Sequence, residues 1–189
     1  MQWTEKDREA LLAFKTHVDC DDIRFKELIK EKLLDNRFIV HVLNNKELEE
    51  ADAEPDDYFN VNIKPMYMIP EIQTKTSAFL CYEVSFNEVK KYNTVIKVGQ
   101  IIFYILCHKE DLIDVETGIA RHDLLAALVL DQFNWTNIFG MQVHCVQDKP
   151  GVTDNDYALR TLIFEGEFVN SIAKTRDGKT RVVNSDVVR

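Results

Sequence analysis

Apolar residues in the first part of the chain recur at helical spacing. Residues 21–33 place Phe25, Leu28, Ile29 and Leu33 on one stripe, with lysines and glutamates between them. Spacings of three and four put such residues on one face of an α-helix. We therefore predict an amphipathic helix that opens near residue 21 and docks through this stripe.

An earlier helix is predicted to start at Thr4, whose side chain can cap the first turn, and Asp7 completes a weak capping box. This helix carries Leu11, Phe14 and Val18 at spacings of three and four, so it too is expected to dock on another element.

Residues 36–45 suit a helix or a strand, and we favour a short helix. The following segment, 47–57, holds seven acidic residues and is predicted to be a solvated loop, with Pro55 stopping any helix. A calcium loop of the EF-hand type needs a glycine turn among its ligands, and this segment has no glycine. No metal site is expected there.

Beyond Pro55 the pattern changes to a period of two, which is typical of strands. Strands are predicted at 61–69, where Pro65 favours an edge position, and at 78–86. The segment 94–108 is the clearest strand, and its second half is apolar on both faces. A strand of that kind is expected at the centre of a sheet, covered on both sides.

The remainder predicts a helix over 119–133, strands near 140–147 and 157–168, and a hairpin over 170–183 that turns at Asp177-Gly178. This order predicts an α+β fold, with a mainly antiparallel sheet packed by helices, N-terminal helices and a C-terminal β-hairpin. We divide the chain into an N-terminal helical extension with an acidic loop (1–57), a core domain (58–168) and a hairpin with a tail (169–189).

Composition narrows the class of protein. A hydrophobic fraction of 46% and a charged fraction of 29% are those of a folded globular protein. No apolar run reaches the roughly 20 residues of a membrane span, and the start of the chain has no secretory apolar region, so synthesis in the cytoplasm is expected. The four cysteines are widely spaced, which disfavours a zinc site or a disulfide framework. A net charge of −9 disfavours a protein that grips nucleic acid.

The triplet Arg121-His122-Asp123 at the start of an apolar helix is the most suggestive polar motif. We interpret it as structural. Asp123 suits the positive end of the helix dipole, and Glu116 precedes the helix. Arg121, Asp123, Arg160 and Glu116 are expected to form inter-subunit or helix-anchoring ion pairs. Because residues 124–130 are apolar nearly all round the helix, a second chain is expected to cover part of it.

A metal-dependent hydrolase is the first alternative. His-Asp phosphohydrolases place such a pair on a helix with further ligands around a metal-bound water, and His108, His122, Asp123 and Asp131 could serve. Those enzymes are nearly all helical, whereas His108 ends a predicted strand. Two neighbours on a helix also point about 100° apart. No nucleophile elbow and no glycine-rich phosphate loop occurs. No catalytic residue, metal or cofactor is therefore expected.

The end of the chain is basic. Residues 174–189 carry a net charge of +3. Such asymmetry suits a protein that meets copies of itself head to tail, with the tail against the acidic loop. It suits a frayed, solvated terminus equally well. The expected contact residues on this arm are Lys174, Arg176, Lys179 and Arg181.

Three segments carry a resemblance to a known class of proteins: "IIFYILCHKED", "TGIARHDLLAALVLDQFN" and "NDYALRTLIFEG". Their layout resembles that of the small neck and tail-completion proteins of tailed bacteriophages. An apolar strand ends near a Cys-His pair, a helix starts in the manner of Gly-x-x-Arg-x-Asp, and a Tyr-x-x-Arg segment precedes the last apolar strand. The resemblance covers roughly residues 58–168.

The resemblance implies a tail terminator or head–tail connector, which is a structural virion protein that assembles as a ring, commonly a hexamer. Its partners would be copies of itself and adjacent neck, portal-side or tail-tube proteins. DNA would pass through the channel without sequence-specific binding, and no membrane is involved. The protein would be made in the host cytoplasm and reside in the virion. A second alternative is a cytoplasmic adaptor that binds one host protein through the N-terminal helices.

Overall fold

The computed structural model describes residues 3–15, 21–68, 78–88, 96–153, 156–169, 172–174 and 180–182. The α-helices are α1 (Glu5–Leu12), α2 (Asp21–Asp35), α3 (Arg37–Val42), α4 (Lys46–Glu50) and α5 (Arg121–Phe133). Short 3-10 helices are η1 (Ala13–Lys15), η2 (Pro55–Tyr58) and η3 (Lys109–Asp111). The strands are β1 (Ile63–Lys64), β2 (Ala78–Glu88), β3 (Ile96–His108), β4 (His144–Val152), β5 (Tyr157–Val169), β6 (Ile172–Lys174) and β7 (Thr180–Val182). The predicted α+β class is confirmed.

Five strands form one sheet in the order β1-β2-β3-β5-β4. All neighbours are antiparallel except β1, which runs parallel to β2 at the edge. The predicted central position of 94–108 is confirmed, because β3 pairs with β2 on one side and β5 on the other. The strand predicted at 61–69 is reduced to two residues, since Pro65 has no N–H to continue the ladder.

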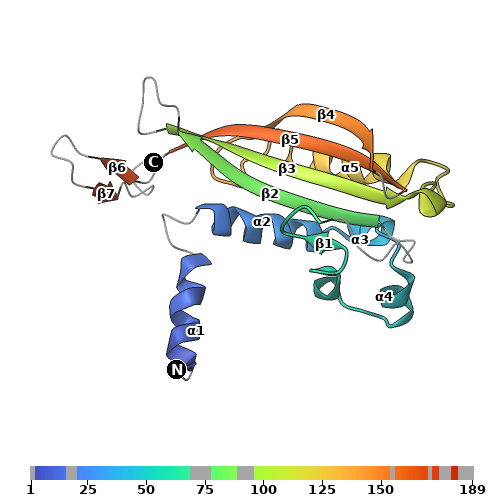
Figure 1. Cartoon of the computed structure of the whole chain (residues 1–189), viewed down its shortest axis with the longest axis horizontal. Coiled ribbons are helices and arrows are strands. Elements are labelled where there is room, and N and C mark those ends of the chain that lie inside the picture. Colours follow the sequence, from blue (N-terminus) through green and yellow to red (C-terminus); the bar gives the residue numbers. More distant parts are fainter. Residues whose placement is uncertain are drawn as a thin grey trace.

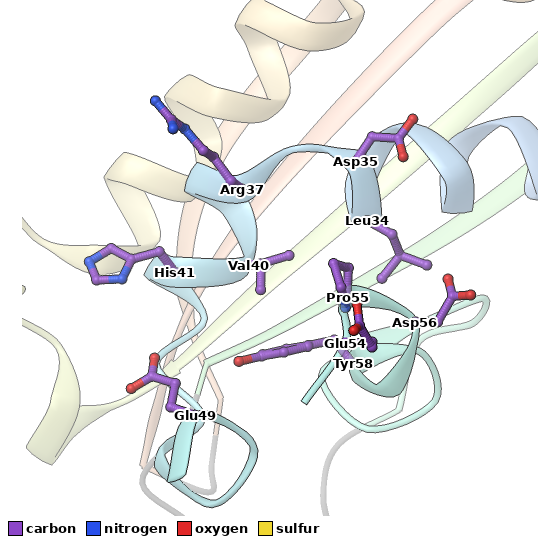
Figure 2. A pocket seen from close by; sticks show the side chains of 10 residues that line it. All are labelled: Leu34, Asp35, Arg37, Val40, His41, Glu49, Glu54, Pro55, Asp56 and Tyr58. Atoms are coloured by element: carbon purple, nitrogen blue, oxygen red, sulfur yellow. The ribbon is translucent and has the colours of Figure 1, made fainter. Parts of the chain in front are cut away.

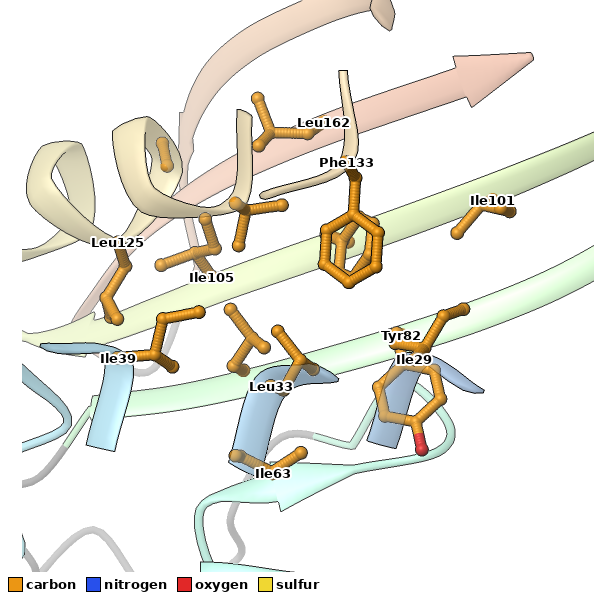
Figure 3. Close-up of a cluster of buried hydrophobic side chains, with 14 of the residues drawn as sticks. Ile29, Leu33, Ile39, Ile63, Tyr82, Ile101, Ile105, Leu125, Phe133 and Leu162 are labelled. Atoms are coloured by element: carbon orange, nitrogen blue, oxygen red, sulfur yellow. The ribbon is translucent and has the colours of Figure 1, made fainter. Parts of the chain in front are cut away.

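Helices α2, α3 and α5 pack on one face of this sheet (Figure 1). Alternate residues of β2 and β3 point toward them, among them Leu80, Tyr82 and Phe103, all fully buried. Figure 3 shows these strands' side chains meeting Ile29 and Leu33 of α2. Burial of each such side chain contributes about 1.5–3 kcal/mol. The apolar stripe of 21–33 therefore docks as predicted, and α2 and α3 share a core with the sheet. The division of the chain after residue 57 stays a prediction.

The described residues cover the opposite face of the sheet near one end. A small cluster of Phe79, Cys81, Leu106 and Tyr157 is buried there. Further along β3, Ile102 is only partly buried. The prediction that β3 is covered on both sides is thus correct for the end of the strand and wrong for its middle.

Helix α1 forms with the predicted capping box, in which the Thr4 N–H donates to Asp7 Oδ2 at 2.8 Å. The expectation that it docks is wrong for the described part of the chain, because α1 buries none of its residues. It projects away from the body (Figure 1). The ion pair Lys15–Glu27, at 2.9 Å, links the end of this arm to α2. Val18 lies outside the described residues.

Two further predictions change. The acidic segment 47–57 contains the helical turns α4 and η2 instead of a plain loop, because Asn45 caps α4 and Pro55 occupies the first turn of η2. The strand placed at 140–147 begins later, at His144.

The helix predicted within 36–45 is confirmed as α3, capped by Asn36. The strands of the C-terminal hairpin pair as β6 and β7, whereas its turn lies outside the described residues.

Part of the apolar surface of α5 is covered within the same chain, and the expectation that a second chain covers the rest stays a prediction. The helix lies on β3 and β5, and α3 lies beside it, where Asn36 Nδ2 donates to Gln132 Oε1 at 2.8 Å. Leu124 and Leu128 are partly buried against the same core. A short helix of the same chain therefore supplies part of the cover.

At the end of the sheet distant from the His108 end, two glycines face each other across β3 and β5. Gly99 pairs with Gly166, and the space above them holds the rings of Phe25, Phe86 and Phe168. A Cβ on Gly166 would lie 2.9 Å from the Gln142 carbonyl oxygen. The missing side chains thus make room for the aromatic cluster and the neighbouring backbone.

We expect Gly166→Ala to lower the free energy of unfolding by about 1–3 kcal/mol, because a backbone atom must move to admit the methyl group. Gly151→Ala is the matched strand control, since the nearest atom to its Cβ would be 3.7 Å away, and should change stability by less than about 0.5 kcal/mol. Urea unfolding followed by circular dichroism measures both. Equal effects of the two variants would contradict the steric explanation.

Candidate functional site: an arginine anchor beside an open acidic groove

Arg121 is buried, with 4% of its surface exposed, and its whole guanidinium is engaged within the chain. Its Nε donates to the Asp111 carbonyl at 3.1 Å, and its Nη2 contacts Asp111 Oδ1 at 3.3 Å. Its Nη1 donates to Asp114 Oδ1 at 3.1 Å and to the Val42 carbonyl at 3.2 Å. One side chain therefore ties the start of α5 to the end of α3 and to the loop between β3 and α5.

The two carboxylates of this anchor are themselves held by other residues. Asn44 Nδ2 donates to both oxygens of Asp111, at 2.9 and 2.8 Å. Asp114 Oδ2 accepts from the Thr117 hydroxyl at 2.7 Å and from its N–H at 3.0 Å. The Thr117 side-chain bond above all, together with its backbone bond and the Arg121 charge, lowers the pKa of Asp114. These hydrogen bonds thus hold both carboxylates in position as charged partners of Arg121.

Arg160 forms a second ion-pair cluster on the helix-bearing face of the sheet. It makes a two-pronged contact with Asp148 of β4, at 2.8 and 2.7 Å, and also binds Asp123 of α5. The Asp148 hydrogen bonds are the main reason that the pKa of Arg160 is raised, and they lower the pKa of Asp148. This cluster links α5 to β5 and β4. Asp123 and Arg160, predicted as ion-pair residues, contact each other within one chain.

The other residues of the sequence prediction are more exposed or lie apart. Glu116 is exposed and lies 3.6 Å from His41 of α3. Lys174 is in β6 and Arg181 is in β7, whereas Arg176 and Lys179 lie outside the described residues.

The residues considered for a metal-dependent hydrolase do not come together around one site. His108 ends β3 on the face opposite the helices, where its ring packs on Tyr157. His122 and Asp123 are in α5, and Asp131 is exposed two turns later. Within the described ranges, no group of three or more His, Cys, Asp or Glu residues is placed to share a metal ion. No described helix is both long and apolar enough to cross a membrane.

An open groove lies next to the Arg121 anchor, between α3, α4 and η2, with a volume of about 740 Å³ (Figure 2). Its floor is apolar and includes Leu34, Val40 and Tyr58. A smaller depression of about 220 Å³ shares His41 and Glu49 with the groove and reaches Arg121. The anchor thus positions α3, which forms one wall of the groove.

The rim of this groove is acidic. Asp35, Glu49, Glu54 and Asp56 line it, against Arg37 and His41. No ion pair is recorded for Asp35, Glu49 or Asp56 with any described residue. Burial, and then the Glu49 charge, raise the pKa of Tyr58. The groove therefore offers apolar contact area surrounded by available negative charge.

Sequence reasoning identified Arg121 but not its partners. Asp111 and Asp114 lie ten and seven residues before it, in the same loop, and their spacing of three was the available signal. The groove was not identified either. Its floor joins the end of α2 to Tyr58, and only the packing of η2 on α2 and α3 brings them together.

A family model named YomW matches residues 25–165, about three quarters of the chain. The chain therefore belongs to the YomW family, and this membership makes it a phage-associated protein. No curated protein matches the sequence. The matched region runs from α2 into β5 and includes the Arg121 anchor and the groove, whereas α1 and the C-terminal arm lie outside it.

We expect Arg121→Met to lower the free energy of unfolding by about 3–5 kcal/mol, because it leaves the buried Asp114 carboxylate without its counter-ion. Arg160→Met is the matched comparison. Its ion pairs are partly exposed, so we expect a loss of about 1–2 kcal/mol. Chemical unfolding curves measure both values. A smaller loss for Arg121→Met than for Arg160→Met would show that the anchor is not the stronger tie.

Acid unfolding tests the Asp114 interactions. Because its folded-state pKa is lowered below the ordinary value of 3.8, the stability it contributes is complete above about pH 4 and disappears as the pH falls through the folded pKa. The stability difference between the wild type and Thr117→Val should therefore shrink as the pH is lowered from 6 toward 2. Val115→Ala, at a 92% exposed position of the same loop, should follow the wild type. A difference that does not vary with pH would contradict this account.

Proposed function

We propose that this protein is a non-enzymatic structural component of the phage neck, a tail terminator or head–tail connector that assembles as a ring of about six copies. Family membership supports the phage context. The resemblance over residues 58–168 supports the narrower role. The strand, helix and strand that carry it correspond to β3, α5 and β5 of the body.

The observation that carries this proposal is the projecting helix α1. It has only eight residues and buries none of them. Isolated helices shorter than about 12–15 residues are marginal in water, so this one needs a partner surface for stability. Trp3 is 67% exposed, Leu11 55% and Leu12 46%. An arm that carries such side chains is suited to burial against a neighbouring subunit.

The net charge of the chain supports the proposal that DNA passes through the channel of the ring. The chain has a net charge of −9, and a ring of such subunits would repel phosphate and allow DNA to slide. The proposed ring would therefore guide DNA without sequence-specific binding.

The exposed helix α1 also favours a second candidate function, an adaptor that binds one host protein. The surface for it would centre on α1, because the apolar stripes of α2 and α3 pack into the core. The two candidates differ in self-association. A structural ring subunit forms a defined oligomer by itself or on its neck partners, whereas an adaptor stays monomeric until it meets its target.

We expect the purified protein to reach the mass of a ring of about six copies as its concentration rises, in multi-angle light scattering on a sizing column. Leu11→Ser/Leu12→Ser should weaken this association about tenfold or more, since each buried leucine contributes about 1.5–3 kcal/mol. The control is Val115→Ser/Val152→Ser, at positions 92% and 82% exposed on the body. A monomer at all concentrations, both alone and with neck proteins, would support the adaptor instead.

A further inference from the structure

We propose that the acidic groove between α3, α4 and η2 binds the basic C-terminal arm, residues 172–189, of a second copy of this chain. The inference rests on the proposed self-assembly and adds the site and the segment through which neighbouring subunits meet.

The groove has the chemistry of a peptide-binding surface. Leu34 and Tyr58, with 4% and 3% of their surfaces exposed, form an apolar floor with Val40. The carboxylates of Asp35, Glu49 and Asp56 stand around it, and all three residues are exposed. With Glu54 and Arg37 included, and His41 neutral, the lining has a net charge of −3. A ligand that matches it combines positive charge with small apolar side chains.

The C-terminal arm has this composition. Five basic residues and two aspartates give residues 174–189 a net charge of +3, equal and opposite to the groove. Valines 182, 183, 187 and 188 alternate with the charged positions in pairs. The rest of the chain has a net charge of −12, so the arm differs in sign from the chain as a whole. The most complementary ligand for the groove is therefore encoded in the same sequence.

The described strands of the arm, β6 and β7, lie at the opposite end of the body from the groove (Figure 1). The chain leaves β5 at Val169, opposite Ile96 at the start of β3. The groove side is tied to the other end, where the Ala78 N–H donates to the Leu43 carbonyl and Ala78 pairs with Cys107. The thirteen residues of β3 separate these ends by about 40 Å.

The arm of one copy therefore does not reach its own groove. Strands β6 (172–174) and β7 (180–182) pair with each other beyond the far end of the sheet. The remaining residues, 183–189, span at most about 24 Å when extended. A second copy must supply the arm. Such a contact joins two different surfaces, and repetition of it closes a ring or continues as a filament.

A charge-swap experiment tests this contact. One variant reverses the groove, with Glu49→Lys and Asp56→Lys, and a second reverses the arm, with Lys179→Glu and Arg181→Glu. Each alone should reduce self-association at least tenfold, measured by sedimentation velocity of the full chain over a concentration series. Mixing the two should restore it, because each arm then meets a groove of opposite charge. Association of the wild type should weaken as salt rises from 50 to 500 mM.

The control reverses two exposed carboxylates outside the groove, Glu31→Lys and Glu167→Lys, and should associate as the wild type does. Circular dichroism confirms that each variant is folded. Association that persists unchanged in the groove and arm variants would overturn the groove–arm contact while leaving the proposed ring intact. Loss of association in both variants without recovery on mixing would overturn it as well. A wild type that never self-associates would overturn both proposals.

Discussion

The buried guanidinium of Arg121 is the interaction on which the arrangement of the helices depends. A buried charge is tolerated only when it is paired and hydrogen-bonded, and Arg121 meets this condition with groups from the end of α3 and from the loop before α5. This requirement sets where α3 lies relative to α5. Because α3 also forms a wall of the groove, the same side chain positions the surface that we propose for subunit contact.

The molecule divides into a body and two projecting segments. The body, from α2 into β5, coincides with the region that matches the YomW family. Helix α1 and the C-terminal arm lie outside that region, and both extend from the body (Figure 1). Helix α1 exposes apolar side chains, and the C-terminal arm carries positive charge. Both features are suited to contacts with another molecule.

Electrostatics gives the arm and the groove complementary roles. Exposed ion pairs contribute little individually, so affinity between subunits must come from several such pairs over an apolar floor. A contact of this kind is weak between free subunits and responds to salt. Under the proposed contact, self-association would therefore depend on both subunit concentration and ionic strength.

Local patterns were sufficient to predict the elements that bury a simple face. The stripe of 21–33 specified α2, the alternation in 78–86 specified β2, and the apolar run of 94–108 specified a central strand. The capping box at Thr4 also followed from neighbouring residues. The sequence alone therefore determined the α+β class, since hydrophobic period reflects which faces are buried.

Relations between distant segments were decided only by the tertiary structure. Part of the apolar surface of α5 is covered by α3, and no local pattern reveals which element will supply such a neighbour. The amphipathic pattern of α1 indicated docking, yet the helix buries nothing against the described body. The partners of Arg121 and the groove beside it depend on how α3, η2 and the loop before α5 pack. Burial and ion pairing at these sites are properties of the assembled fold, and no single stretch of sequence contains them.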